Sequence, residues 1–467
     1  MTELLTTSAR DLGARIQRRE VSSVEVVDAH IRQIERVNPV LNAVVRARFE
    51  EARIEARAAD EKLKRNEQVG PLHGVPCTIK ECFALTGMPN TSGLLSRKGW
   101  LATEDAAAVS KLRAAGAIPL GVTNVSELCM WLESNNRVYG RTNNPYDPAR
   151  TVGGSSGGEG AIIAAGGSPF GLGSDVGGSI RMPAFFNGIF GHKPTGGWID
   201  NRGQFPMTTG DALRYLTSGP LCRRATDLAP ILRVLGPERE LAAPEEVDLR
   251  GLEVVSVTTG LTRLSDDLRE TQAKAERALS DRGARVRHED IPLLKRAIEI
   301  WAAMMDATGG PSFSEFLGGG KPISAVMQLL LLALGRSPHT LPAIGLAVVE
   351  KLPKLMPKRN AALRSLGAEL KADLLARIGS GVMLYPSYSM PAPRHHQPLL
   401  PPTHWGYTAI FNVMETPVTQ VPMGLNAAGL PLGLQVIGSH HNDHVPLGVA
   451  LALEEAFGGW VPAPRWT

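Results

Sequence analysis

Residues 151–195 read TVGGSSGGEGAIIAAGGSPFGLGSDVGGSIRMPAFFNGIFGHKPT and hold two serine clusters flanked by glycine. The first is Gly-Gly-Ser-Ser-Gly-Gly at 153–158, and the second is Gly-Gly-Ser at 177–179. Glycines on both sides of a serine indicate a sharp turn or a close approach of the backbone. Successive N–H groups in such a turn can point inward together and attract negative charge. A serine held there is placed to attack a carbonyl, and these N–H groups can stabilise the resulting oxyanion.

The same composition would suit a flexible Gly/Ser linker. The residues between the clusters argue against a linker because they are apolar. Residues 161–165, Ala-Ile-Ile-Ala-Ala, predict a buried helix, and residues 170–173, Phe-Gly-Leu-Gly, predict the end of a buried strand. We therefore expect the whole stretch to be structured.

Length, charge and cysteine content exclude several classes of protein. The chain has 467 residues, 43% of them apolar, which is enough for one large or two ordinary domains with a sizeable core. A net charge of +4 does not indicate a nucleic-acid partner. Four irregularly spaced cysteines predict neither disulfides nor a zinc site. Since there is no signal peptide and no apolar run of about 18 residues, we expect a cytoplasmic protein without a transmembrane segment.

Helical and strand patterns alternate on both sides of the serine clusters. A short apolar strand at 75–79 ends next to Lys80, and a helix is predicted to end at Pro39 and another to begin over 123–127. Further strands are predicted at 118–122, 252–257, 382–386, 418–422 and 432–437, and further helices at 106–115, 266–282 and 444–457. This alternation predicts an α/β fold with a large, mixed, mostly parallel sheet sandwiched between helices.

Residues 290–375 differ from the rest because they contain two strongly apolar helical segments, 323–334 and 341–349. A helix that is apolar nearly all round is buried, or it touches a hydrophobic ligand or a membrane surface. We interpret the segment as an inserted helical cap over a pocket. The predicted organisation is an N-terminal helical segment at 1–65, an α/β core at 66–289, the cap at 290–375 and the remaining core at 376–467.

Three segments together resemble the amidase signature family: 153–160 (GGSSGGEG), 173–183 (GSDVGGSIRMP) and 191–195 (GHKPT). Lys80, in the sequence Thr-Ile-Lys-Glu, fits the upstream lysine of that family. The pattern is long and highly specific, and the resemblance covers most of the chain. Within the family, the chain is most similar to the fatty-acid amide hydrolase branch of the second type, and the resemblance is weakest over the cap.

The resemblance implies the amidase-signature fold and a Ser-Ser-Lys triad. Ser179 would be the nucleophile, Ser155 the bridging serine in a cis peptide, and Lys80 the base. A serine hydroxyl is a poor nucleophile unless a base removes its proton, and a buried lysine can be that base when it is uncharged. Ser155 would pass the proton from Ser179 to Lys80 and later return it to the leaving nitrogen. No cofactor and no metal is implied.

The resemblance also assigns roles to the neighbouring residues. The backbone N–H groups expected to form the oxyanion hole are those of Val176, Gly177, Gly178 and Ser179. The residues expected to support the site are Ser156, Ser174, Asp175 and Arg181. Cys129 and Met130 are expected to contact the substrate. An acyl-enzyme on Ser179 would be hydrolysed by water.

Three other classes of function are possible. A nucleotide-binding protein is disfavoured because the sequence lacks G-x-x-x-x-G-K-[ST]. A metal hydrolase could use the histidines of 440–444 or His395 and His396, although both groups lie in polar, loop-like sequence. A non-catalytic subunit is disfavoured because Lys80 and both serines are intact.

Within the hydrolase class, amides, esters and carbamates are all accessible to a serine nucleophile. The apolar cap favours a small-molecule hydrophobic amide or carbamate as substrate. The alternatives are a urethanase acting mainly on aryl carbamates, a fatty-acid amide hydrolase and, less favoured, a glutamine amidotransferase subunit. We expect a monomer or a homodimer.

Overall fold

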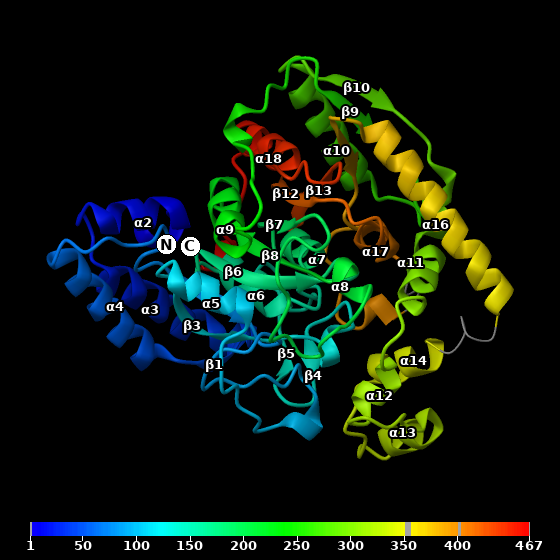
Figure 1. The fold of residues 1–467 in the computed structure, drawn as a ribbon, viewed down its shortest axis with the longest axis horizontal. Coiled ribbons are helices and arrows are strands. Elements are labelled where there is room, and N and C mark those ends of the chain that lie inside the picture. Colours follow the sequence, from blue (N-terminus) through cyan, green and yellow to red (C-terminus); the bar gives the residue numbers. More distant parts are fainter. Residues whose placement is uncertain (1, 351–355, 400–402, 467) are drawn as a thin grey trace.

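The computed structural model describes residues 2–350, 356–399 and 403–466, and a single large sheet runs through its centre (Figure 1). In this part of the chain the sheet has 11 strands in the order β1-β3-β2-β6-β8-β7-β12-β13-β11-β9-β10. The strands are β1 Val44–Ala47, β2 Pro76–Lys80, β3 Ile118–Thr123, β6 Phe170–Asp175, β7 Phe190–Lys193, β8 Thr217–Cys222, β9 Glu253–Ser256, β10 Arg285–His288, β11 Val382–Tyr385, β12 Val418–Leu425 and β13 Pro431–Gly438. A separate hairpin pairs β4 Asn135–Asn136 with β5 Gly140–Arg141.

The sheet is mixed, as the sequence predicted. β2 lies parallel to β3 and β6, and β9 lies parallel to β10 and β11. The strands between these two parallel groups pair antiparallel: β8 with β6 and β7, and β12 with β7 and β13. β1 with β3 and β11 with β13 are antiparallel as well, so antiparallel neighbours outnumber parallel ones in the described sheet.

Helices cover both faces of the sheet. In β11, Val382 and Leu384 pack into a core shared with α2, α5, α9, α10 and α18, whereas Met383 and Tyr385 pack into another core shared with α11, α16 and α17. Successive side chains of a strand point to opposite faces, so the two cores lie on the two sides of the sheet. The helices are α1 Glu3–Thr6, α2 Ala9–Gln17, α3 Ser23–Leu41, α4 Phe49–Lys64, α5 Ala107–Ala114, α6 Gly157–Ala164, α7 Arg181–Phe186, α8 Ala212–Tyr215, α9 Leu228–Leu235, α10 Asp266–Ser280, α11 Ala297–Asp306, α12 Phe313–Leu317, α13 Ala325–Ala333, α14 Leu341–Val349, α16 Pro357–Ile378, α17 Gly406–Val413 and α18 His444–Phe457.

One predicted helix end and one predicted helix are wrong. α3 continues through Pro39 to Leu41 and stops where Asn42 adopts a left-handed conformation with φ 50°. A proline this close to the end costs little of the helix's hydrogen bonding, and the left-handed residue ends it. The helix expected to begin over 123–127 does not form. Only a 3₁₀ turn, Glu127–Cys129, is present there.

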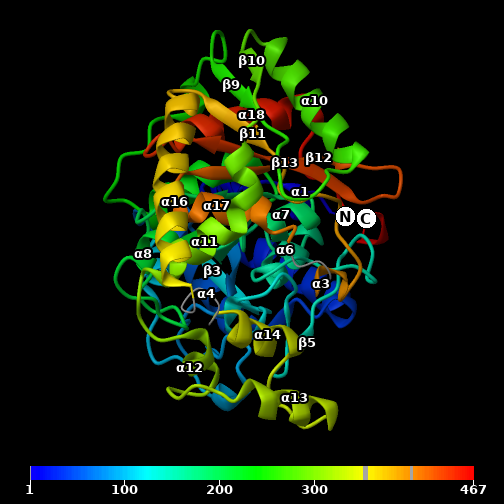
Figure 2. The same cartoon turned by 90° about the vertical axis from the view of Figure 1, so that its right-hand side faces the viewer.

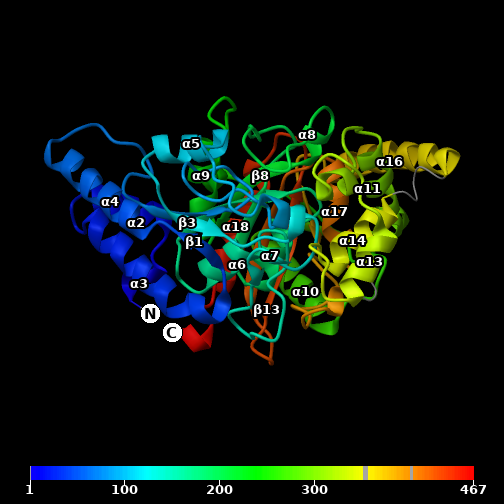
Figure 3. The same cartoon turned by 90° about the horizontal axis from the view of Figure 1, so that it is seen from below.

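The helices of the cap region lie at the opposite end of the molecule from α2–α4, with the sheet between them (Figure 3). α12, α13 and α14 extend away from the sheet (Figures 1 and 2). α13 has no buried residue, and the buried residues of α14 are Ala343, Ile344 and Ala347. Within the described residues, no helix is both long and apolar enough to span a bilayer. The four-segment organisation stays a prediction, and residues 351–355 of the expected cap lie outside the described residues.

Candidate active site

The predicted catalytic residues come together where two neighbouring parallel strands, β2 and β6, end. Lys80 is the last residue of β2, and Asp175 is the last residue of its parallel neighbour β6. The carboxyl ends of parallel strands lie at the same edge, so the turn at 176–180 comes next to Lys80. Ser155 approaches from the segment that leads into α6.

The Lys80 amine lies among hydroxyl groups. Lys80 is fully buried, and its Nζ donates hydrogen bonds to Ser155 Oγ at 2.7 Å, Ser174 Oγ at 2.9 Å and the Ser174 carbonyl at 3.3 Å. No ion pair within the described residues includes this lysine. All three partners of the amine are therefore oxygen atoms, and two of them belong to serine hydroxyl groups.

The two serines lie on separate turns. The peptide bond between Gly154 and Ser155 is cis, and a Cβ on Gly154 would lie 2.2 Å from the Trp131 carbonyl oxygen, so the backbone approach there requires glycine. Ser179 is 7% exposed, and its carbonyl accepts a hydrogen bond from the Ser156 N–H at 3.3 Å. In the described residues no hydrogen bond joins the Ser155 and Ser179 hydroxyls. Catalytic hydrogen bonds are often long in the free enzyme and tighten once substrate is bound.

A buried ion pair holds the turn that carries Ser179. Asp175 accepts hydrogen bonds from the N–H groups of Gly178 at 2.7 Å and Ile180 at 3.0 Å, and from Arg181 Nε at 3.0 Å and Nη2 at 2.9 Å. Burial alone would raise the pKa of Asp175, but the charge and hydrogen bonds of Arg181 outweigh burial and hold it well below its usual range. Arg181 also binds the Thr408 carbonyl and two side-chain oxygens from α17 and β13.

Three N–H groups of this turn are available to an oxyanion. Those of Val176, Gly177 and Ser179 donate to no other described residue, whereas that of Gly178 is committed to Asp175. Gly178 has φ 118°, and a Cβ there would lie 2.1 Å from Thr408 Oγ1. The shape of the turn therefore requires glycine, and the fourth predicted donor is turned toward the carboxylate.

Glu159 is a buried carboxyl group near Lys80 that the sequence analysis did not assign to the site. It accepts hydrogen bonds from Thr78 Oγ1 at 2.5 Å and Thr123 Oγ1 at 2.8 Å. Burial raises its pKa to about 8, although both hydrogen bonds and the neighbouring lysine oppose the rise. A carboxyl group in the otherwise apolar α6, directly after the glycines, was the signal that could have identified it.

Glu81, next to Lys80 in sequence, was also missed. Its Oε1 accepts hydrogen bonds from the Thr91 N–H, the Thr91 hydroxyl and the Tyr139 hydroxyl, and its Oε2 accepts one from the Ser92 N–H, each at 2.7 Å. Burial raises the pKa of Glu81 to about 7 despite these bonds. The Glu81 side chain therefore holds the backbone of residues 91 and 92 in place.

One of the two predicted substrate-contacting residues, Cys129, lies next to Ser155. The Cys129 thiol contacts Cys82 and Ser155, and the hydrogen bond with Cys82, together with the nearby Lys80, lowers the pKa of Cys129. Met130 follows it and is partly buried. That Cys129 and Met130 contact the substrate stays a prediction.

An aromatic pair that the sequence analysis missed lies beside the turn at 176–180. Trp301 of α11 donates from Nε1 to the Val176 carbonyl at 2.8 Å, and its ring meets that of Trp405 edge-on with centroids 4.9 Å apart. Both rings lie within 3.8 Å of the position that a Cβ on Gly177 would take. No local pattern could have placed these tryptophans, because their proximity depends on the tertiary fold.

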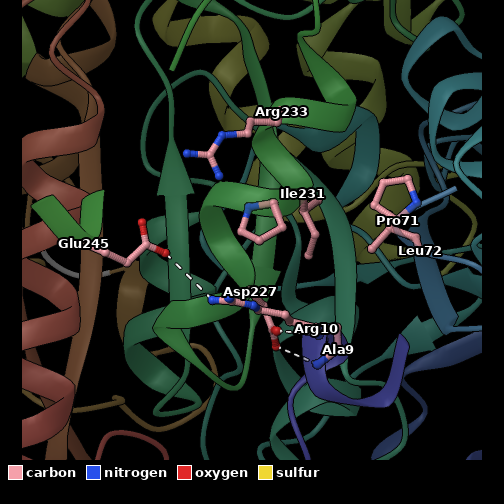
Figure 4. Close-up of a pocket in the computed structure, with 9 residues that line it drawn as sticks. Ala9, Arg10, Pro71, Leu72, Asp227, Ile231, Arg233 and Glu245 are labelled. Atoms are coloured by element: carbon pink, nitrogen blue, oxygen red, sulfur yellow. Dashed lines mark hydrogen bonds and ion pairs between the residues drawn. The ribbon is translucent and has the colours of Figure 1, made fainter. Parts of the chain in front are cut away.

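The described residues also contain a cavity that lies apart from these side chains. A pocket of about 300 Å³ lies between α2 and α9, where Asp227 accepts hydrogen bonds from the Ala9 and Arg10 N–H groups at 2.9 Å each (Figure 4). It contains none of the predicted site residues. Within the described ranges, no three His, Cys, Asp or Glu side chains are grouped as a metal site requires. His395 pairs instead with Glu133 at 3.3 Å, and His440 contacts the Met414 carbonyl at 2.8 Å.

Comparison with known proteins agrees with this architecture. The family model described as Amidase matches residues 25–447. The chain is 45% identical to fatty-acid amide hydrolase 2 of Homo sapiens and 47% identical to fatty-acid amide hydrolase 2-A of Danio rerio, with 98% of this chain and 90% of each relative covered. A bacterial aryl acylamidase of the amidase signature enzymes family shares the fold, with a TM-score of 0.82 at 24% identity over 100% of this chain and 98% of that one. The chain therefore belongs to the amidase family, has the amidase-signature fold and is a carbon–nitrogen hydrolase.

Proposed function

We propose that this protein hydrolyses hydrophobic amides and carbamates through a triad of Ser179, Ser155 and Lys80. One observation carries the proposal: a fully buried amine lies 2.7 Å from the Ser155 hydroxyl and has no ion-pair partner among the described residues. An uncharged amine in that position can accept a proton from a serine. In addition, the N–H groups that a tetrahedral oxyanion needs lie on the turn that carries Ser179.

The reaction would begin when Ser179 Oγ attacks the substrate carbonyl while its proton passes to Ser155 and the proton of Ser155 passes to Lys80. The N–H groups of Val176, Gly177 and Ser179 would stabilise the oxyanion. Lys80 would then return a proton through Ser155 to the leaving nitrogen, and the C–N bond would break to leave an ester on Ser179. Water would attack this ester by the same proton route and regenerate the free serine.

The substrate class follows from the apolar surroundings of the turn. The Trp301–Trp405 pair lies against Gly177, and α14 contributes Ala343 and Ala347 to the apolar cluster around Leu128, the neighbour of Cys129. The named relatives are fatty-acid amide hydrolases, which supports a hydrophobic acyl group here too. A carbamate presents the same kind of carbonyl to Ser179, so aryl carbamates and fatty-acid amides are the two substrate types to compare.

A hydrolysis panel tests the proposal. Wild type and Ser179→Ala are assayed on an aryl anilide, a long-chain amide, an aryl carbamate and glutamine. We expect the alanine variant to lose nearly all turnover on every substrate that the wild type cleaves, and glutamine to be the poorest substrate. Ser168→Ala is the matched control, because Ser168 is also fully buried and, within the described residues, its hydroxyl donates only to the Phe170 carbonyl, at 2.6 Å. Equal rates for wild type and Ser179→Ala on any cleaved substrate would overturn the nucleophile assignment.

A further inference from the structure

The Glu127 carboxylate connects the 3₁₀ turn Glu127–Cys129 to His339 and Thr340, the residues that precede α14. Glu127 Oε1 lies 2.7 Å from His339 Nδ1, and Oε2 accepts a hydrogen bond from the Thr340 N–H at 2.8 Å. Glu127 is 2% exposed and His339 is 5% exposed. Both hydrogen bonds of Glu127 are shielded from water, and a hydrogen bond to a carboxylate is stronger than one between neutral groups. They therefore hold residues 339–340 firmly against Glu127.

On its own side, Glu127 begins the turn that presents Cys129. Leu128 and Cys129 both have left-handed backbones, with φ 52° and 59°, and the Leu128 N–H donates to the Ser92 carbonyl at 2.7 Å. Non-glycine residues rarely adopt this conformation unless the surroundings enforce it. A displacement of Glu127 would therefore also change the turn that presents Cys129, a residue predicted to contact the substrate.

On the side of His339, the helices α12, α13 and α14 make few other contacts with the rest of the protein. We call residues 312–350 the lid segment. Glu350 accepts hydrogen bonds from the N–H groups of Phe313 and Ser314, at 2.7 and 2.9 Å, which closes the segment on itself. Of its two longest helices, α13 buries no residue and α14 buries three. Its apolar contact with the body of the protein is a small cluster that includes Leu128, the neighbour of Glu127.

We propose that Glu127 is a positioning residue that fastens the lid segment to the substrate-contacting turn and thereby sets how tightly the apolar part of the substrate is held. The kinetic consequence rests on the proposed function. The structural consequence does not, since the attachment of the lid segment can be measured without substrate. The reacting atoms are touched by neither Glu127 nor His339, so the effect should fall on binding of long acyl groups rather than on chemistry.

The test uses Glu127→Gln and His339→Asn, which break the same contact from opposite sides, and His395→Asn as a control. His395 also pairs with a buried carboxylate, Glu133, but from a loop outside the lid segment. Each protein is assayed with an acetyl anilide and a dodecanoyl anilide of the same amine. Hydrogen exchange is followed across residues 323–349 in the substrate-free enzymes.

We expect both test variants to raise KM for the dodecanoyl substrate about tenfold, the low end for a lost hydrogen bond to a charged group, with kcat for the acetyl substrate unchanged. We also expect faster exchange across 323–349, with the control like wild type in both assays. Equal effects on the two substrates, or wild-type exchange in both test variants, would overturn the proposal. If no protein cleaves either anilide, the proposed function fails, and the exchange result alone decides whether Glu127 fastens the lid segment.

Discussion

Replacement of Lys80 by methionine tests the proposed base directly. Methionine has a similar length and no amine, so it removes the proton acceptor 2.7 Å from Ser155 while filling most of the space. General acid–base catalysis contributes about 10²–10⁴ to a rate. Because the triad is proposed to act as a unit, we expect a loss near 10⁴ in kcat, about 5.5 kcal/mol.

The same substitution should have a much smaller effect on folding. It leaves the Ser155 and Ser174 hydroxyls without their lysine partner, at about 1 kcal/mol each, and it removes the cost of burying an amine. We therefore expect the free energy of unfolding to change by no more than about 2 kcal/mol. Urea unfolding of both proteins checks this, so that lost activity is not mistaken for lost structure.

Lys193→Met provides the matched control for this experiment. Lys193 is the other lysine among the largest fully buried side chains; its Nζ donates to the Pro194 carbonyl at 2.9 Å, and burial lowers its pKa to about 7. It contacts neither serine, so we expect kcat to stay within about threefold of wild type. Initial rates on an aryl anilide at pH 7 to 9 make the comparison. Near-normal turnover by Lys80→Met, or equal losses in both variants, would refute the reasoning.

Three further predictions concern the buried groups around the turn. Burial raises the pKa of Glu159 to about 8, so between about pH 4.5 and 8 the folded chain keeps a proton that the unfolded chain releases, and the free energy of unfolding falls as pH rises through that window. Because the side chain of Glu159→Gln cannot ionise, the Tm of this variant relative to wild type should rise from pH 6 to pH 9. A constant difference in Tm would contradict the assignment. Gly178→Ala would place a Cβ 2.1 Å from Thr408 Oγ1 on a left-handed backbone, and it should lower the free energy of unfolding in urea by about 1–3 kcal/mol. An unchanged free energy would show that the turn does not require glycine. Arg181→Met leaves Asp175 buried without its counter-charge and should cost about 3–5 kcal/mol, part of which Asp175→Asn in the same chain should recover; a double variant no more stable than the single one would show that the ion pair is not the cause.

Much of the fold could be predicted because local signals were strong. The polar pairs Thr7-Ser8 and Ser22-Ser23 before apolar helical patterns predict N-caps, and the structure has them at Ser8 and Ser22. α18 has the bounds that its pattern predicted. The glycines at 153–158 and 177–178 indicated close backbone approach, and the structure shows it at Gly154 and Gly178. These features depend on neighbours in sequence, which a pattern can show.

The features that were missed depend on contacts between distant segments. β8 contains Ser, Gly and Pro and has little strand character of its own, yet β6 and β7 enclose it. The helix expected near Glu127 is replaced by a left-handed turn because Glu127 is bound from the lid segment, more than 200 residues away. Likewise, no pattern could show that the Gly178 N–H turns toward Asp175, which reduces the expected oxyanion donors from four to three.

The most direct test of the account is to locate the acyl group. The enzyme is mixed with an activated aryl carbamate, quenched in acid and digested with trypsin. The peptide 151–181 is then sequenced by tandem mass spectrometry; its serines are Ser155, Ser156, Ser168, Ser174 and Ser179. We predict a carbamoyl group on Ser179 alone, formed at least about 10³-fold more slowly in Lys80→Met. A group on any other serine, or equal labelling rates in the two proteins, would contradict the proposed mechanism.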